Sequence, residues 1–163
     1  MTLSPAPQLS LHSPVGDITV TEDEGAIVSL DWGWAGRQTT TPLLDEAVRQ
    51  LHAYFDGDTE GFALPLAPAG TAFQQRVWQS MAAIPYGATR TYGEVAAGLG
   101  TGPRAVGAAC GRNPIPIILP CHRVLGAGGR LHGYSGGEGL ETKRALLDLE
   151  RAVMTVIHQG EGS

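Results

Sequence analysis

Short runs of alternating apolar and polar residues occupy the first part of the chain, separated by residues typical of turns. Residues 9–12, 17–21 and 26–30 each have the length and alternation of a strand with one buried face. Residues 13–16 and 22–25, between them, are rich in residues that favour turns. The pattern predicts a small antiparallel sheet.

A longer apolar pattern with helical spacing follows the predicted strands. Thr41 and Pro42 suit the cap and the first position of a helix. The apolar residues that follow recur at helical spacing up to Gly57, and they are Leu43, Leu44, Ala47, Val48, Leu51, Tyr54 and Phe55. A stretch rich in Gly, Pro and Ala comes next. We therefore expect an N-terminal α/β domain over residues 1–67, with a linker that starts at residue 57.

Three further helices are predicted beyond the linker. Thr71 and Gln74 have the spacing of a capping box, and so do Thr91 and Glu94, so each pair marks a helix start. Pro103 suits the first position of a third helix, which follows a Gly-rich turn. Two short helices joined by such a turn predict a helix-turn-helix.

Gly and Ala make up most of the third predicted helix, and Arg104 lies in its first turn. Small residues let the backbone approach another surface closely. Such a helix commonly packs against a neighbouring helix. It can also lie against a groove of nucleic acid, with an arginine available to enter the base stack.

The charges divide unevenly along the chain. The net charge is −5, but residues 1–67 hold 2 Arg against 10 Asp and Glu, or −8, and the remaining residues hold 9 Lys and Arg against 6, or +3. An acidic front and a basic back indicate two units, with an anionic partner on the second. The 42% apolar content is enough for a buried core. No apolar run approaches the roughly 20 residues of a membrane-spanning helix.

The cysteine content and the start of the chain indicate the compartment. Cys110 and Cys121 are too few for a disulfide scaffold or an all-cysteine zinc site. The first residues lack the basic start and apolar stretch of a secretory signal. We therefore expect a cytoplasmic protein with no metal and no cofactor.

The setting of Cys121 indicates chemistry. A short apolar run, interrupted at Pro116, precedes it and is at best an edge strand. His122 and Arg123 follow directly, which would favour the thiolate. Adjacent side chains on an extended strand point to opposite faces, so His122 would need a water or a bend to reach the sulfur. By contrast, we expect Cys110 to be a buried residue without chemistry.

A last helix is predicted from Leu140, with Leu146, Leu149 and Val153 facing inward. Glu150 lies near its expected end. A glutamate there is commonly solvated, but it could instead orient His122 as the third member of a Cys-His-Glu relay. We expect residues 156–163 to form a tail.

These motifs resemble those of the O6-alkylguanine-DNA alkyltransferases, the methylated-DNA–protein-cysteine methyltransferases. The similarity covers residues 73–150 and rests on NPIP at 113–116 followed by PCHRV at 120–124, with RAVG at 104–107 and YSGG at 134–137. The N-terminal part resembles the family's smaller α/β domain more loosely. The resemblance implies an α+β fold of two domains. The C-terminal domain, residues 68–155, would be mainly helical, with a winged-helix-like helix-turn-helix and a short strand at the active site.

The resemblance also implies roles for individual residues. Cys121 would accept the alkyl group while His122, a bridging water and Glu150 draw off its proton, and Tyr92 would help the guanine to leave. The residues implied in substrate binding are Ser135 beside O6, Val124 at the exocyclic amine, Pro116 in the pocket wall and Asn113 as a hinge. The residues implied in DNA binding are Arg104, which fills the gap left by the base, with Ala105, Gly107, Ala108, Thr91 and Arg123.

The implied partner is double-stranded DNA that contains alkylated guanine, bound through its minor groove by a monomer. The implied reaction is a direct, irreversible transfer to Cys121 after base flipping, with O4-alkylthymine as a further candidate substrate. Free cysteine has a pKa of ~8.5, so a base or a cation must raise the thiolate fraction. A donor such as Tyr92 would assist the guanine leaving group. A thioether has no carbonyl for water to attack, so each molecule would act once.

Other functions remain open. An alkylated-DNA-binding protein without transfer activity would share the helix-turn-helix, although such relatives lack the acceptor cysteine. The chain departs from the family pattern in a shorter loop near Thr101 and a longer segment near Glu138. A protein of this kind would require that these departures misassemble the relay. A thiol hydrolase or redox protein would leave Arg104 and Asn113 unexplained. A transcription factor would need more polar side chains on its recognition helix.

Overall fold

The N-terminal domain contains the antiparallel sheet that the alternating pattern predicts. The computed structural model describes residues 5–59, 61–131 and 139–161. Strands β1 (Gln8–Leu11), β2 (Ile18–Asp23) and β3 (Ala26–Trp32) form one sheet in the order β1-β2-β3. Glu24 and Gly25, with φ of 49° and 81°, connect β2 to β3. Two successive left-handed residues are what a tight two-residue hairpin requires.

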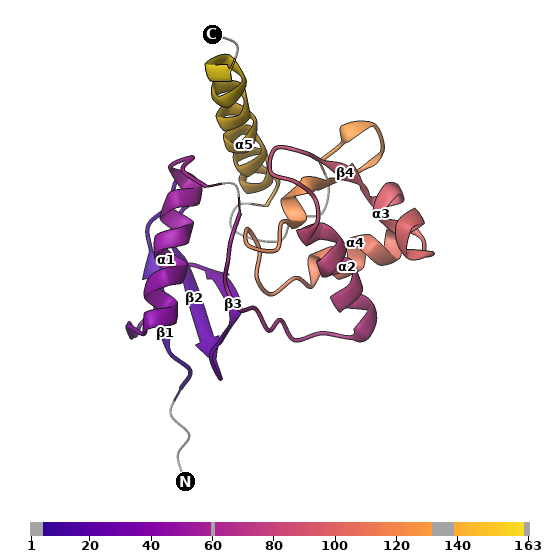
Figure 1. The fold of residues 1–163 in the computed structure, drawn as a ribbon. Helices are drawn as coiled ribbons and strands as arrows, with labels where there is room; N and C mark the ends of the chain where they lie inside the picture. Colours follow the sequence, from indigo (N-terminus) through magenta and orange to yellow (C-terminus); the bar gives the residue numbers. More distant parts are fainter. Residues whose placement is uncertain (1–4, 60, 132–138, 162–163) are drawn as a thin grey trace.

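Helix α1 (Pro42–Phe55) covers one face of this sheet (Figure 1). Its first turn is capped by the Thr41 hydroxyl, which accepts a hydrogen bond from the Leu44 amide at 3.0 Å. The side chains of Leu44, Leu51 and Tyr54 are fully buried on the inner face. The helical spacing of the apolar residues therefore identified this helix and its packed face correctly.

The C-terminal domain begins with the three predicted helices. They are α2 (Ala72–Ala82), α3 (Tyr92–Leu99) and α4 (Pro103–Gly111). Both capping boxes form, at Thr71 and at Thr91. Gly100, with φ of 70°, ends α3 in the left-handed conformation typical of a helix C-terminus. The chain then reverses, and α4 packs against α3 as a helix-turn-helix.

A two-stranded parallel sheet lies beside these helices. Strand β4 (Arg90–Thr91) pairs with β5 (Val124–Leu125). The short 3-10 helices η1 (Cys121–Arg123) and η2 (Ala127–Gly129) flank β5. This sheet therefore connects the start of α3 to the segment that holds Cys121.

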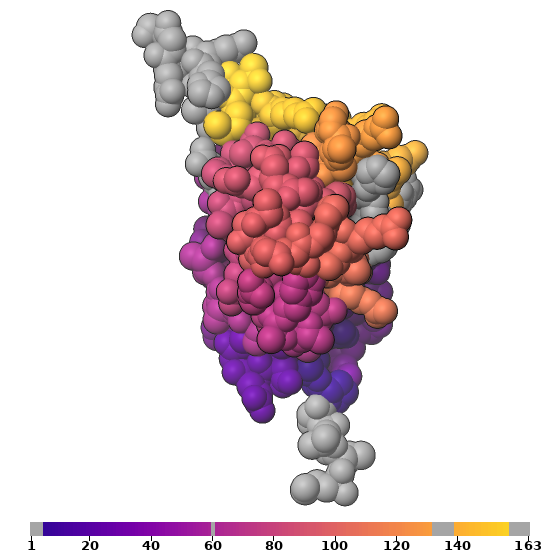
Figure 2. All heavy atoms as spheres, turned by 90° about the vertical axis from the view of Figure 1, so that its right-hand side faces the viewer, coloured from indigo at the N-terminus to yellow at the C-terminus, as the bar shows by residue number. Residues whose placement is uncertain are grey.

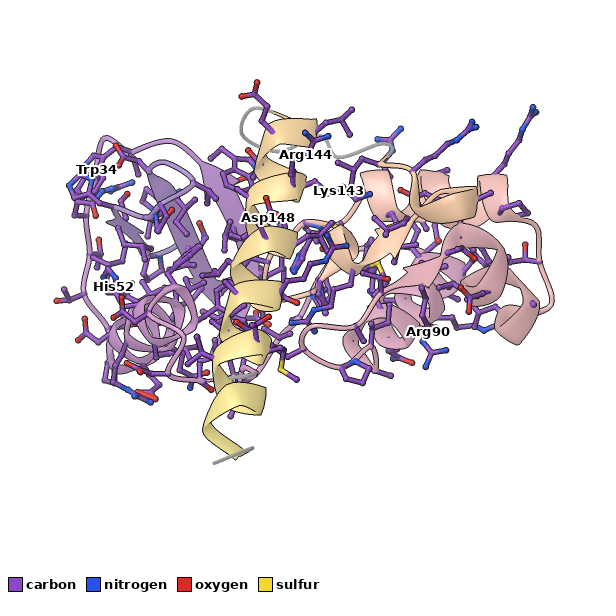
Figure 3. All side chains as sticks on the ribbon, turned by 90° about the horizontal axis from the view of Figure 1, so that it is seen from above. Trp34, His52, Arg90, Lys143, Arg144 and Asp148 are labelled. Atoms are coloured by element: carbon purple, nitrogen blue, oxygen red, sulfur yellow. The ribbon has the colours of Figure 1, made fainter. Side chains whose placement is uncertain are left out.

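Helix α5 (Leu140–Glu161) runs across the boundary between the two domains (Figure 3). It continues through residues 156–161, in the stretch expected as a tail, so Glu150 lies in its middle and not near its end. Among residues 5–59, 61–131 and 139–161, no helix is both long and apolar enough to cross a membrane.

The two domains share one apolar core and are also joined through the backbone. The Leu30 amide of β3 donates to the Pro114 carbonyl at 2.9 Å. Ile27 of β3 also pairs with the linker. Its amide donates to the Pro65 carbonyl, and its carbonyl accepts from the Ala67 amide. The N-terminal sheet therefore supports the loop that leads to Cys121.

Candidate active site

The apolar run before Cys121 forms tight turns, so the short edge strand that we expected there is wrong. The Ile118 amide donates to the Pro116 carbonyl at 2.9 Å, which closes a three-residue turn around Ile117. Ile117 has a φ of 73°, a strained conformation for a β-branched residue. Because Pro116 has no N–H for a strand ladder, the run cannot continue as a strand. The strand of this region is β5, which follows Cys121.

The Asn113 side chain holds this loop at both ends. Its Nδ2 donates to the Leu119 carbonyl at 2.8 Å, and its Oδ1 accepts from the Ile115 amide at 2.9 Å. The Leu119 carbonyl also accepts from the Cys121 amide at 2.8 Å, which bends the chain around Pro120. An amide side chain carries both a donor and an acceptor, as this loop requires. Asn113 follows α4 closely, so it connects that helix to the turn at Cys121.

Cys121 and His122 lie in η1, not on an extended strand, and both are buried. The exposed fraction is 6% for Cys121 and zero for His122. Burial raises the pKa of the Cys121 thiol and lowers the pKa of His122, because both charged forms lose water. The resting site therefore contains a neutral thiol and a neutral imidazole.

Glu150 accepts a hydrogen bond from His122, with 2.6 Å between Nε2 and Oε2. Burial alone would raise the pKa of Glu150, but its hydrogen bonds and the positive charges around it hold that pKa at about 2. An ionised carboxylate can only accept, so Nε2 carries the proton and Nδ1 is unprotonated. Within the described residues, His122 Nδ1 has no hydrogen-bond partner. The nitrogen able to take a proton is therefore the one not bound by Glu150.

Arg123, which we expected among the DNA-binding residues, is directed into the protein. Its side chain is buried, with Nε 2.9 Å from Glu150 Oε1 and Nη2 3.1 Å from Oε2. Its Nη1 donates to the Ile84 carbonyl at 2.8 Å. A buried carboxylate requires a cation, and Arg123 supplies it. It follows that Arg123 compensates the charge of Glu150 and does not provide the positive charge that we expected at the Cys121 sulfur.

Lys143 is a cation that acts on the Cys121 sulfur, and we did not predict it from the sequence. Its side chain is 1% exposed, and its charge acts to lower the pKa of Cys121. Its Nζ lies 3.4 Å from the Tyr92 hydroxyl and 5.5 Å from the centre of that ring. Figure 3 shows Lys143 pointing from α5 toward the C-terminal domain. Its spacing from Glu150, two helical turns, was the available signal, because it places both residues on one face.

The structure describes two of the remaining residues that were predicted to bind the substrate, and both are buried. Val124 is fully buried in β5, where it pairs with Arg90. Pro116 is buried in the turn before Cys121. Ser135 lies outside the described residues.

An open groove lies beside the relay. It has a volume of about 510 Å³ and is lined by Thr91, Tyr92, Gly93, Pro103, Arg104, Gly107, Gly126 and Ala127. Four of these residues were predicted to bind DNA or assist the leaving group. Tyr92 also connects the groove to the thiols. Burial raises its pKa, and negative charge on Cys110 or Cys121 raises it further.

The face of α4 toward this groove is open. Arg104 and Ala108 are exposed, and Ala105 and Gly107 are half-buried. A Cβ atom at Gly107 would meet nothing within 4 Å, so packing within the described protein does not require a glycine there. Figure 2 shows side chains of the α4 segment projecting from this side of the C-terminal domain. The buried residues of α4, Val106, Ala109 and Cys110, lie on its other face.

The two-domain protein therefore holds a buried thiol and a histidine–carboxylate pair beside an open helix-turn-helix groove. Residues 72–152 match the family model described as "6-O-methylguanine DNA methyltransferase, DNA binding domain". Residues 9–68 match "6-O-methylguanine DNA methyltransferase, ribonuclease-like domain". The chain therefore belongs to the 6-O-methylguanine DNA methyltransferase family.

Individual relatives cover most of the chain. A methylated-DNA–protein-cysteine methyltransferase of Mycolicibacterium paratuberculosis is 53% identical over 155 residues, which is 87% of this chain and 90% of the relative. A protein of the same name from Methanosarcina acetivorans is 45% identical over 149 residues, covering 85% and 94%. The crystal structure of Mycobacterium tuberculosis O6-methylguanine methyltransferase superposes with a TM-score of 0.81 at 41% identity, covering 91% and 94%. A crystal structure of Mycobacterium tuberculosis OGT in complex with DNA gives 0.80 at 45% identity, covering 90% and 93%.

Proposed function

We propose that this protein repairs DNA by transferring the alkyl group from O6 of guanine to Cys121, once per molecule. The observation that carries the proposal is the relay, in which a buried thiol lies next to a histidine whose Nε2 is bound to an ionised carboxylate. The family and the names of the relatives, all methylated-DNA–protein-cysteine methyltransferases, support the same activity.

The proton of the Cys121 thiol passes to His122 Nδ1, through a bridging water. Glu150 stabilises the imidazolium that forms, because it is held as an anion against Nε2. The thiolate sulfur attacks the alkyl carbon, so an S–C bond forms while the C–O6 bond breaks and its electron pair goes to the guanine. The thioether offers no bond that water can cleave easily, which makes the transfer irreversible.

Tyr92 assists the departure of the guanine. Burial raises the pKa of its hydroxyl, so Tyr92 keeps its proton and donates it, or a hydrogen bond, as negative charge develops on the base. The proton that His122 took from the thiol balances the one that the guanine gains. Lys143, whose Nζ lies 3.4 Å from the Tyr92 oxygen, stabilises that oxygen as the proton leaves.

The groove beside Tyr92 suits the minor groove of duplex DNA. The open α4 face has small residues at Gly107 and Ala108, so a backbone can approach closely, and Arg104 is free to occupy the space of an extruded base. The relative solved in complex with DNA supports DNA as the partner. One chain supplies every group of the relay, which favours a monomer, and two free thiols favour the cytoplasm.

The test is a stoichiometric transfer to an identified atom. Equimolar protein is mixed with a duplex that contains O6-methylguanine, and the adduct is located by intact mass and peptide mapping. We expect one methyl group on Cys121 and restored guanine. The matched control is Cys110→Ala, which we expect to transfer like the unchanged protein, whereas Cys121→Ser binds the duplex and transfers nothing.

Two outcomes would contradict the proposal. Unmodified protein that still binds the methylated duplex would indicate a binding protein without transfer activity. Repeated turnover on a small ester, with no methyl group retained, would indicate a thiol hydrolase.

A further inference from the structure

The N-terminal domain contributes a side chain to the relay. Tyr54 of α1 is fully buried, and its hydroxyl lies 2.6 Å from Glu150 Oε2. This is the same oxygen that accepts the hydrogen bond from His122 Nε2, also at 2.6 Å. Tyr54 and Glu150 are 96 residues apart in sequence. Only the docking of α1 against α5 brings them together.

The Tyr54 hydroxyl is a permanent donor in this contact. Burial, and then the charge of Glu150, raise the pKa of Tyr54 far above its ordinary value, so it does not ionise. A protonated phenol next to an ionised carboxylate donates to it. The ring is held by Phe55, Phe62 and Tyr86, with centroids 5.2, 5.4 and 5.9 Å away. The direction of donation is therefore fixed.

Glu150 divides its negative charge among several donors. Among the described residues, Oε2 accepts from Tyr54, His122 and Arg123, and Oε1 accepts from Arg123 and the Gly87 amide at 3.0 Å. Each donor reduces the charge that is left to stabilise an imidazolium at His122. The Arg123 guanidinium still holds both carboxylate oxygens when Tyr54 is absent. Removing the phenol hydroxyl therefore changes the charge on Oε2 more than its position.

We propose that Tyr54 is a positioning residue of the relay, through which the N-terminal domain limits the basicity of His122 and keeps Cys121 protonated until a substrate arrives. The inference rests on the proposed function for the identity of that substrate. The hydrogen bond from Tyr54 would protect the protein from inactivation. A cysteine that reacts only once is lost whenever another electrophile or an oxidant reacts with its thiolate.

The test compares Tyr54→Phe with the unchanged residue in a Cys110→Ala background, where Cys121 is the remaining thiol. The rate of Cys121 alkylation by iodoacetamide is measured against pH. We expect the inflection to move to lower pH by about half a unit, which gives a roughly threefold higher rate below the inflection. The matched control is Phe55→Leu, which disturbs the packing around the Tyr54 ring but leaves its hydroxyl. We expect this control to lower the melting temperature without moving the inflection.

An unchanged inflection in Tyr54→Phe, or one at higher pH, would overturn the proposal and leave Tyr54 a structural residue only. A second measurement repeats the substitution in a Glu150→Gln background. There Tyr54→Phe is expected to add no further shift, because Tyr54 acts through the carboxylate. A full further shift would overturn the proposal. Methyl transfer from a methylated duplex is recorded in parallel, so a failure of the proposed function is seen separately from the thiol titration.

Discussion

Lys143 is a buried cation on α5, and the groups around it explain its position. Burial lowers the pKa of Lys143, while negative charge on Cys121 or Cys110 acts in the opposite direction. An ammonium group in a protein interior is costly unless it interacts with negative charge. In the proposed reaction, negative charge develops first on the Cys121 sulfur and then near the Tyr92 oxygen. Lys143 is close to both, so its cost is offset during the transfer.

Replacing Lys143 tests this argument. Lys143→Met keeps most of the side-chain volume and removes the charge, so we expect the thiol pKa to rise further and the pH profile of transfer to move to higher pH. The single-turnover rate at neutral pH is expected to fall by about tenfold, equivalent to one pKa unit. The measurement is the rate of methyl transfer from a methylated duplex between pH 6 and about pH 9.

The matched control for Lys143→Met is Arg144→Met, which removes the neighbouring charge from α5. Arg144 is exposed (Figure 3). We expect its pH profile to remain unchanged. A Lys143→Met profile that coincides with that of the control would contradict the role of Lys143.

At the scale of elements, α4 is divided into a buried face and an open one. Val106, Ala109 and Cys110 pack against the core, and Trp78 of α2 donates its indole N–H to the Ala109 carbonyl at 2.9 Å. The open face holds Arg104 and Gly107 along the groove. The small residues of α4 therefore serve close packing on one side and leave space for a partner on the other.

Arg104→Ala separates duplex recognition from the chemistry at the sulfur. We expect transfer from a methylated duplex to slow by about tenfold or more, since nothing then offsets the few kcal/mol of unstacking a base. Reaction with the free base O6-methylguanine is expected to be unaffected, because that base needs no extrusion. The measurement is the ratio of the two rates.

The control for Arg104→Ala is Arg37→Ala, which removes the same charge from an exposed position of the N-terminal domain. Its two rates are expected to match those of the unchanged protein. Equal slowing of both reactions by Arg104→Ala would argue against base flipping.

Local signals predicted the elements well because their causes are local. The boxes at Thr71 and Thr91 and the prolines at positions 42 and 103 act within one helical turn, so the sequence pattern located four helix starts. The turns before Cys121 have a different origin. They depend on the Asn113 clamp and on the hydrogen bond between Leu30 and Pro114, which joins residues far apart in sequence.

In the candidate site too, local motifs were predictable and contacts between distant segments were not. The PCHRV motif identified Cys121 and His122 directly, but the partner of Arg123 could not be predicted from its neighbours. Arg123 directly follows Cys121 and His122 in the sequence, and only the packing of α5 on η1 brings Glu150 to it. Lys143 was missed because an isolated lysine on an amphipathic helix is usually solvated.

At the scale of the whole molecule, Glu150 is the point where the domains meet. It receives hydrogen bonds from α1 through Tyr54, from η1 through His122 and Arg123, and from the turn at Gly87. A single buried carboxylate therefore contributes both to the proposed reaction and to the docking of the two domains. Protonating it is expected to weaken the entire assembly, because its ion pair with Arg123 is buried.

This dependence predicts how stability changes in acid. The folded-state pKa of Glu150, about 2, lies below its ordinary value of 4.5. Its contribution is therefore present above about pH 4.5 and is lost as the pH falls toward 2. His122 acts in the same direction, since its pKa is also lowered and its protonation below pH 6.5 favours the unfolded chain. We expect the free energy of unfolding to fall by about 3 kcal/mol between pH 5 and the acid limit on account of Glu150.

Urea denaturation at several pH values between pH 7 and about pH 2.5 measures this loss. Glu150→Gln is expected to be less stable at neutral pH by about 3–5 kcal/mol, because Arg123 is left buried without its partner. Below pH 5 it is expected to lose about 3 kcal/mol less than the unchanged protein, and the loss that remains is the share of His122. Asp148→Asn, which changes an exposed carboxylate on the same helix (Figure 3), is expected to retain the acid dependence of the unchanged protein. If Asp148→Asn and Glu150→Gln lose stability in parallel between pH 5 and about pH 3, the acid sensitivity belongs to the general charge of the surface and Glu150 does not join the domains as described.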